Sequence, residues 1–222
     1  MLGGQPLGDG RYSRAMTIDE RLSTLDELWS IWAELGQAMT DEQWRRPTRL
    51  GDWDVRSLYS HAAWWPTGLS MLVDSVRDAE PTHPTAVALL RDFNAPDGIA
   101  NTLRDAVAAD ARENAVKHST EQLVEWFAGT GPRAIATARR LGPVVIDYFG
   151  VALLRLDEAA GIGVLEATVH LLDLHRALDR PPEVPAAGLT QTAAILAEMA
   201  PPVEFIEVAT GRSASGLFPV LS

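Results

Sequence analysis

The chain has 222 residues, a formal net charge of −11 and no cysteine. Its length fits one domain with a sizeable hydrophobic core, or one domain with a small appendage. The negative charge argues against binding to nucleic acid or to anionic membrane surfaces, because such binding needs clustered Lys and Arg. The absence of cysteine excludes disulfides, zinc sites with Cys ligands and a thiol nucleophile of the protein's own. We therefore expect a small-molecule substrate or a protein partner, and a metal site built from His, Asp and Glu.

The first 15 residues lack the basic segment and the apolar segment of a signal peptide. We expect residues 1–15 to form a flexible leader. Elsewhere, the apolar runs are shorter than the roughly 20 residues that a membrane-spanning helix needs. These features predict a cytoplasmic protein.

Two helices are predicted in the first third of the chain, where apolar residues recur at three- and four-residue steps. The first covers about residues 18–39 and begins with a capping box formed by Thr17 and Glu20. The second begins after Asp54 as its N-cap and continues through a kink at Pro66. Three tryptophans surround His61 in the second helix, and we favour core packing over the wall of a ligand cleft as their role: Trp53, Trp64 and Trp65.

Four substantial helices dominate the pattern of the whole chain, which predicts an all-α protein, a four-helix bundle with a short C-terminal helix. Helical periodicity covers residues 98–117, then a segment that starts at Ser119 and meets a break or kink at residues 129–132, and a later helix that contains residues 166–175. A short helix follows over about residues 189–199. Residues 143–150 read as an extended buried connector, and residues 203–213 alternate like a small strand.

The stretch "EATVHLLDLH", residues 166–175, places two carboxylates and two histidines on one leucine-rich helix. Since each helical residue advances by about 100°, Glu166 and His170 lie about 40° apart, and Asp173 lies about 20° from Glu166. His175 falls on nearly the opposite side. The helical phase therefore predicts a polar triplet of Glu166, His170 and Asp173, and it separates His175 from that triplet.

Two interpretations of the triplet are open from the residues alone. It fits a solvated surface stripe with weak pairing between successive turns, which is the commoner arrangement. It also fits a face that points into the bundle, where buried charge requires a cation or a strongly hydrogen-bonded partner. His61 lies close to the apolar stripe of its helix, as a core histidine or as a third ligand. Two histidines and one carboxylate suit Zn²⁺, and suit Fe²⁺ or Ni²⁺ less well.

The segment "LGDWDVRSLYSHAAW", residues 50–64, resembles the W-x-V-x-D-x-x-x-H helix start of the mycothiol-dependent maleylpyruvate isomerase N-terminal domain, a family of the DinB/YfiT-like superfamily. Residues 166–178, "EATVHLLDLHRAL", resemble that family's second signature, E-x-x-x-H-x-x-D-x-x-x-A. The order and separation of the two motifs agree with the family. One departure is that Asp54 and Ser57 stand where the family pattern has Ser or Thr and Asp.

The resemblance implies a DinB-like four-helix bundle that binds metal over residues 16–181, followed by a short C-terminal extension, residues 182–222. It implies that His61, Glu166 and His170 are the metal ligands, normally for zinc. It also implies a catalytic acidic residue at Asp173. The segment "ATGRS" near the C-terminus is similar to a Gly-Arg element of full-length relatives, so that Arg212 matches their functional arginine.

These features together lead to the hypothesis of a metal-dependent transferase or isomerase that uses mycothiol or a related low-molecular-weight thiol on a small electrophile. The missing cysteines fit this chemistry, since the thiol must then come from a second small molecule. Two alternatives are a non-catalytic metal-binding bundle with a sensing or dimerisation role, and a thiol-independent metal hydrolase. A homodimer is a further expectation from the superfamily.

Overall fold

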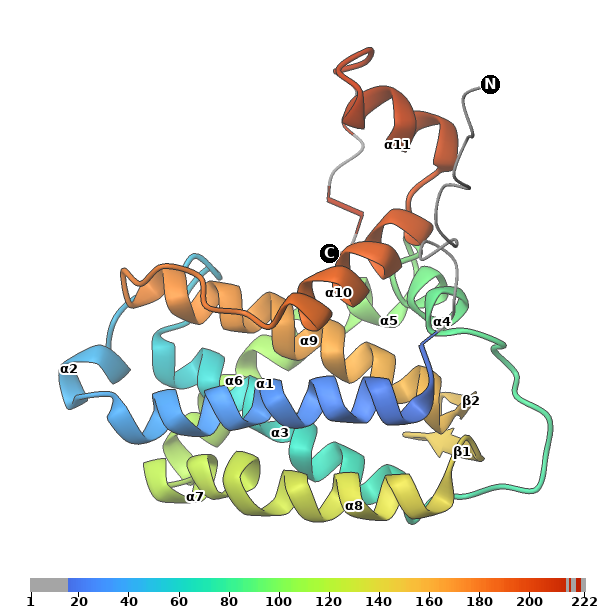
Figure 1. Ribbon diagram of the computed structural model, residues 1–222. Helices are drawn as coiled ribbons and strands as arrows, with labels where there is room; N and C mark the ends of the chain where they lie inside the picture. The colour runs from blue at the N-terminus through green and yellow to red at the C-terminus, as the bar shows by residue number, and fades with distance from the viewer. Residues whose placement is uncertain (1–15, 215, 217–218, 221–222) are drawn as a thin grey trace, which may run out of the picture.

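The computed structural model describes residues 16–214, 216 and 219–220 of the chain, so that the predicted leader, residues 1–15, lies outside the described residues. Figure 1 shows the arrangement of the helices and of the small sheet. In chain order the elements are α1 (Ile18–Ala38), α2 (Asp41–Trp44), α3 (Val55–Leu72), α4 (Ala86–Phe93), α5 (Ile99–Thr102), α6 (Arg104–Lys117), α7 (Thr120–Glu125), a π-helical turn (Trp126–Thr130), α8 (Gly131–Leu141), β1 (Val145–Tyr148), β2 (Ala152–Arg155), α9 (Leu156–Ala177), α10 (Ala186–Met199) and α11 (Pro202–Ala209).

The core lies between four long helical segments: α1, α3, α9 and the continuous unit of α7, the π-helical turn and α8. Its centre is aromatic. The rings of Trp32 and Phe127 stack with centroids 5.3 Å apart, and the Tyr59 hydroxyl donates to the Trp32 carbonyl oxygen at 2.9 Å. Burying a side chain of this size stabilises the fold by about 2 kcal/mol or more. The prediction of an all-α bundle with a small strand is confirmed, since the only sheet in the described residues has two strands.

The predicted helix starts agree with the structure. Thr17 and Glu20 form both hydrogen bonds of the capping box at the start of α1. Asp54 caps α3, because its Oδ1 accepts from the Ser57 backbone N–H at 2.8 Å and from the Ser57 hydroxyl at 2.6 Å. Pro66 lies inside α3 without ending it.

The break or kink expected at residues 129–132 takes the form of a π-helical turn over Trp126–Thr130, which joins α7 to α8 within one rod. Glycine is required there because a Cβ on Gly131 would lie 2.6 Å from a ring carbon of Trp29. The widened turn and the missing side chain let the rod pack closely against α1. The segment 98–117 is also divided, into α5 and α6.

The extended connector is the first strand of an antiparallel hairpin, in which Val145 pairs with Arg155 and Tyr148 pairs with Ala152. Its turn contains Phe149, a non-glycine residue with φ of 56°. The hairpin closes the end of the bundle where α3 stops, because Val76 forms a bridge with Ile146.

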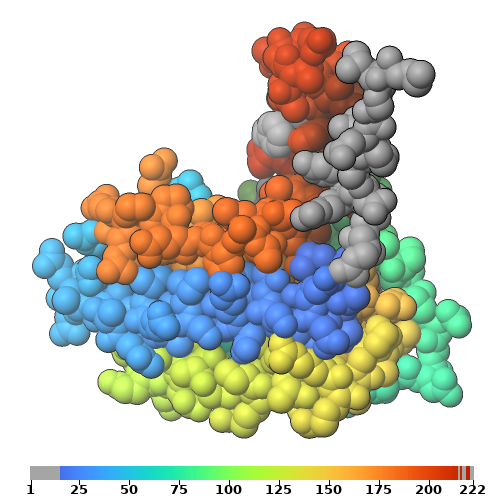
Figure 2. Space-filling model, in the orientation of Figure 1, coloured from blue at the N-terminus to red at the C-terminus, as the bar shows by residue number. Residues whose placement is uncertain are grey.

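The small strand expected over residues 203–213 is wrong, since Pro202–Ala209 form α11. Pro201 is the N-cap of α11, and Pro202 occupies the first helical position, where the fixed φ of proline favours a helix. Phe205 and Val208, three residues apart, are its partly buried side chains, so the helical period applies. Helix α11 packs against α10 and projects from the bundle (Figures 1 and 2). None of the described helices is long and apolar enough to cross a membrane.

The cap of α3 gives a test of the local energetics. We expect Asp54→Ala to lower the free energy of unfolding by about 1 kcal/mol, because the backbone N–H of Ser57 loses its acceptor. Urea unfolding measures the change. Glu27→Ala, at an exposed position of α1, removes a carboxylate that caps no helix and should change the stability by less than about 0.5 kcal/mol. Equal stabilities of the two variants would contradict the assigned role of the cap.

Candidate metal centre

Two neighbouring helices supply three side chains that converge on one point. His61 comes from the middle of α3, and Glu166 and His170 come from successive turns of α9, which packs against α3. One potential ligand atom from each residue lies within 4.8 Å of those of the other two. Among the described residues this is the one group of three His, Asp or Glu side chains close enough to share a metal ion. The inward-facing interpretation of the α9 stripe therefore agrees with the geometry.

The orientation of the three groups is favourable for a shared cation. His170 Nε2 lies 3.5 Å from Glu166 Oε2. The imidazole rings of His61 and His170 have centroids 5.0 Å apart and stand nearly perpendicular, at 89°. The three residues are partly buried, so water screens their charges less than it does at the surface. A carboxylate and two imidazoles in this setting are a donor set that fits zinc.

Asp173 contacts the ring nitrogen of His170 that points away from Glu166. Its Oδ2 lies 3.1 Å from His170 Nδ1, and its Oδ1 accepts a hydrogen bond from Arg49 Nε at 2.7 Å. The Asp173 side chain is 3% exposed, whereas that of Arg49 is 54% exposed. With Nδ1 bound to a carboxylate, Nε2 is the nitrogen of His170 that faces Glu166 and is free to bind a cation.

The surroundings shift the pKa values of the three candidate ligands in different directions. Burial, together with the charge of His170, lowers the pKa of His61 to about 4. Burial also acts to lower the pKa of His170. Its hydrogen bonds to Asp173 and Glu166 outweigh the effect of burial and raise this pKa to about 9. For Glu166 burial acts to raise the pKa, and the hydrogen bond and charge of His170 outweigh it, so that the pKa lies below its ordinary value. Without a metal, the positive charge that balances Glu166 is therefore on His170.

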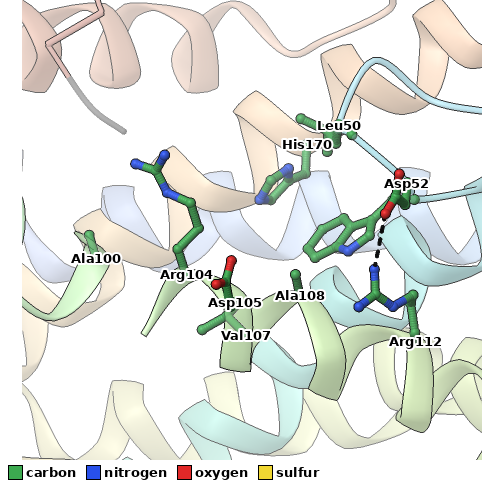
Figure 3. Close-up of a pocket in the computed structure, with 11 residues that line it drawn as sticks. Leu50, Asp52, Ala100, Arg104, Asp105, Val107, Ala108, Arg112 and His170 are labelled. Atoms are coloured by element: carbon green, nitrogen blue, oxygen red, sulfur yellow. Dashed lines mark ion pairs between the residues drawn. The ribbon is translucent and has the colours of Figure 1, made fainter. Parts of the chain in front are cut away.

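A cleft of about 810 Å³ opens beside His170. Its apolar wall includes Leu50 and Trp53 from the loop before α3, and Val107 and Ala108 from α6. Figure 3 shows the charged side chains of α6 at its rim: Arg104, Asp105 and Arg112. The candidate metal centre is therefore reachable by a small molecule rather than sealed in the core.

Trp53 connects the cleft to the candidate ligands, because its ring lies 5.0 Å from that of His61 between centroids. Of the three tryptophans near His61, Trp53 packs against the core, as favoured from the sequence, and it also lines the cleft. Trp64 departs from the core interpretation, being 39% exposed and in contact with Phe149. Trp65 packs against the core, as expected. Tryptophan is large and amphipathic, so sequence alone does not separate these environments.

The other residues considered from the sequence lie outside the group. His175 is buried apart from the triplet, as the helical phase predicts, and His83 pairs with Asp92. Arg212 is exposed in the turn that follows α11, and the structure does not bring it together with the candidate ligands. Its role in catalysis stays a prediction.

Comparison with protein families agrees with this geometry. Residues 25–175 match the family described as the mycothiol maleylpyruvate isomerase N-terminal domain. The chain belongs to this family. The matched region contains His61, Glu166, His170 and Asp173 and ends before Arg212. No curated protein and no solved structure matches the chain.

Sequence reasoning missed Arg49 and the charged rim of α6. Arg49 lies in a loop whose only local signal is a cluster of turn residues, and its partner Asp173 is 124 residues away in the chain. No local periodicity reports such a contact. The proximity of residues 104–112 to His170 depends on the packing of α6 against α3, which likewise has no local signature.

We expect His170→Ala to abolish stoichiometric binding of zinc, because the site then keeps one imidazole and one carboxylate. Zinc should raise the melting temperature of the wild-type chain by an amount that grows with the logarithm of its concentration, and leave that of the variant unchanged. The matched control is His83→Ala, which removes a histidine that pairs with Asp92 and is not one of the candidate ligands, and it should retain the zinc-dependent shift. Equal zinc content in all three proteins would rule out this ligand set.

We expect Arg49→Ala to weaken zinc binding by roughly 10-fold, because Asp173 then loses the partner that fixes its position behind His170. Competition with a chromogenic chelator measures the affinity. Arg46→Ala is the matched control, since Arg46 also joins this loop to the end of α9, through Asp179 at 3.2 Å, but does not contact Asp173. If both variants bind zinc as the wild type does, the Arg49–Asp173 pair has no role at the metal centre.

Proposed function

We propose that this protein is a zinc-dependent enzyme that uses mycothiol, or a related low-molecular-weight thiol, in a transferase or isomerase reaction on a small electrophilic substrate. The observation that carries the proposal is the convergence of His61, Glu166 and His170 within 4.8 Å beside an open cleft. Membership of the mycothiol maleylpyruvate isomerase N-terminal domain family supports the choice of thiol.

The charge of Glu166, as well as the type of the three ligands, favours a divalent cation at this site. Glu166 lies between the helices with its carboxylate next to two imidazoles, and a buried carboxylate is stable only with a compensating positive charge. His170 supplies that charge in its protonated form. A zinc ion held by His61, Glu166 and His170 would replace the proton, supply the positive charge that Glu166 needs, and add one further positive charge to the site. Nickel and iron fit the same donors less well than zinc.

The absence of cysteine supports the use of an external thiol. A bound divalent cation with an open position supplies the Lewis acidity that favours the thiolate form of a thiol at neutral pH. The chain's own contributions are to orient His170 through Asp173 and to offer the apolar wall of the cleft to the reactants. Addition of the thiol to an activated double bond gives transfer, and its departure after bond rotation gives isomerisation.

The test is a thermal-shift titration of the full chain with mycothiol, carried out on zinc-loaded and metal-free protein. Reduced mycothiol should raise the melting temperature of the zinc-loaded protein, because a ligand that binds only the folded state stabilises it. Mycothiol disulfide, which carries the same sugar groups without a free thiol, should produce a much smaller shift. Metal-free protein and His170→Ala should respond to neither compound.

Two results would overturn the proposal. Equal shifts with the reduced thiol and the disulfide would mean that the thiol group is not recognised. Turnover of an ester or amide substrate by zinc-loaded protein without any thiol would instead favour a metal hydrolase.

A further inference from the structure

The rim of the cleft contains a guanidinium group with no counter-charge. Arg104 begins α6, and its Nη2 donates to Asn101 Oδ1 at 3.2 Å. In the described part of the chain, Arg104 forms no ion pair with a carboxylate. It is therefore able to bind an anion without first breaking an ion pair.

Arg112, the second arginine on this rim, differs from Arg104 because a carboxylate lies beside its guanidinium group. Its Nη1 lies 3.8 Å from Asp52 Oδ2, so it already has a neighbouring carboxylate. Figure 3 shows this pair beside the cleft, while Arg104 extends separately towards the space beside His170. Of the two arginines, Arg104 is thus the one with its charge available to a ligand.

The wall of the cleft beside Arg104 and His170 contains several apolar side chains. Val107, one turn along α6 from Arg104, is 42% exposed although it lines the cleft. Trp53 and Leu50 face the same space from the opposite side. A ligand with a short hydrocarbon body would cover this apolar surface, which a free carboxylate ion such as acetate would not do.

We propose that Arg104 is a specificity-determining residue that binds a carboxylate of the molecule whose other end reacts at the metal centre. This inference rests on the proposed function and extends it, because it states the charge and shape of the substrate. The guanidinium fork matches a carboxylate in two parallel hydrogen bonds. The ligand is then an acidic molecule with an apolar middle segment and a reactive group at the opposite end.

Asp105 weakens the attraction of Arg104 for a ligand carboxylate. Its carboxylate lines the same rim, and it repels an incoming carboxylate. Arg104 is exposed, so water and salt also weaken the attraction. We therefore expect a moderate preference for the carboxylate, one that decreases as ionic strength rises.

The experiment uses matched thiol probes on the full chain loaded with Co²⁺ in place of zinc. Two pairs share a chain length and differ in the end group: 3-mercaptopropionate with 3-mercaptopropan-1-ol, and 6-mercaptohexanoate with 6-mercaptohexan-1-ol. The absorption band of a thiolate bound to cobalt reports entry of the thiol into the metal centre. Calorimetric titration gives the affinity of each probe, whether or not the band appears.

For at least one chain length, the carboxylate should bind about fivefold more tightly than the alcohol. Arg104→Gln should reduce this ratio to less than twofold, and Arg104→Lys should retain part of it, because the charge remains without the fork. The matched control is Arg133→Gln on α8, which removes the same charge at an exposed position outside the cleft, and it should keep the wild-type ratio.

The outcomes separate this inference from the proposed function. A cobalt–thiolate band without any carboxylate preference would overturn the role of Arg104 and leave the thiol chemistry standing. A preference that persists in Arg104→Gln would also overturn it. Absence of the band with every probe would contradict thiol activation, while a calorimetric preference that depends on Arg104 would still support the carboxylate site.

Discussion

The buried carboxylate of Glu166 is the constraint on which the rest of the site depends. A charged group between packed helices needs a positive partner within a few ångströms, since water has only limited access to it. His170 on the next turn of α9 and His61 on α3 are the groups that face it. This requirement fixes the relative register of the two helices, because a slide of one turn along either helix would separate His61 from the other two residues.

The loop between α2 and α3 contacts the candidate metal centre through two residues, Arg49 and Trp53. Arg49 holds Asp173, which in turn holds His170, and Trp53 contacts His61 and lines the cleft. The loop is itself fastened, because the Thr48 backbone N–H donates to the Trp53 carbonyl at 2.9 Å and Val55 N–H donates to Arg46 O at 2.8 Å. A displacement of this short segment would therefore change the position of Asp173 and the shape of the cleft together.

Helical periodicity predicted the arrangement of residues that are close together in the sequence. The helical phase of residues 166–175 grouped Glu166 with His170 and excluded His175, and the structure agrees on both points. Phase alone did not reveal which face of α9 points inward, and it took His61, on another helix, to favour the buried interpretation. The Arg49–Asp173 contact and the position of Arg104 have no counterpart in the sequence pattern, because they arise from the packing of segments far apart in the chain.

The start of α3 shows why the motif around His61 tolerates exchange of residue types. The family pattern places Ser or Thr at the cap and Asp three residues later, whereas this chain has Asp54 and Ser57. The two side chains still bind each other, with the Ser57 hydroxyl 2.6 Å from Asp54 Oδ1, and the backbone N–H of Ser57 still has its acceptor. What the site requires is a fixed first residue of the helix, because His61 follows the cap by about two turns and its direction depends on where the helix begins. Asp54 and Ser57 meet that requirement, so the departure from the family pattern leaves the start of α3, and with it the position of His61, intact.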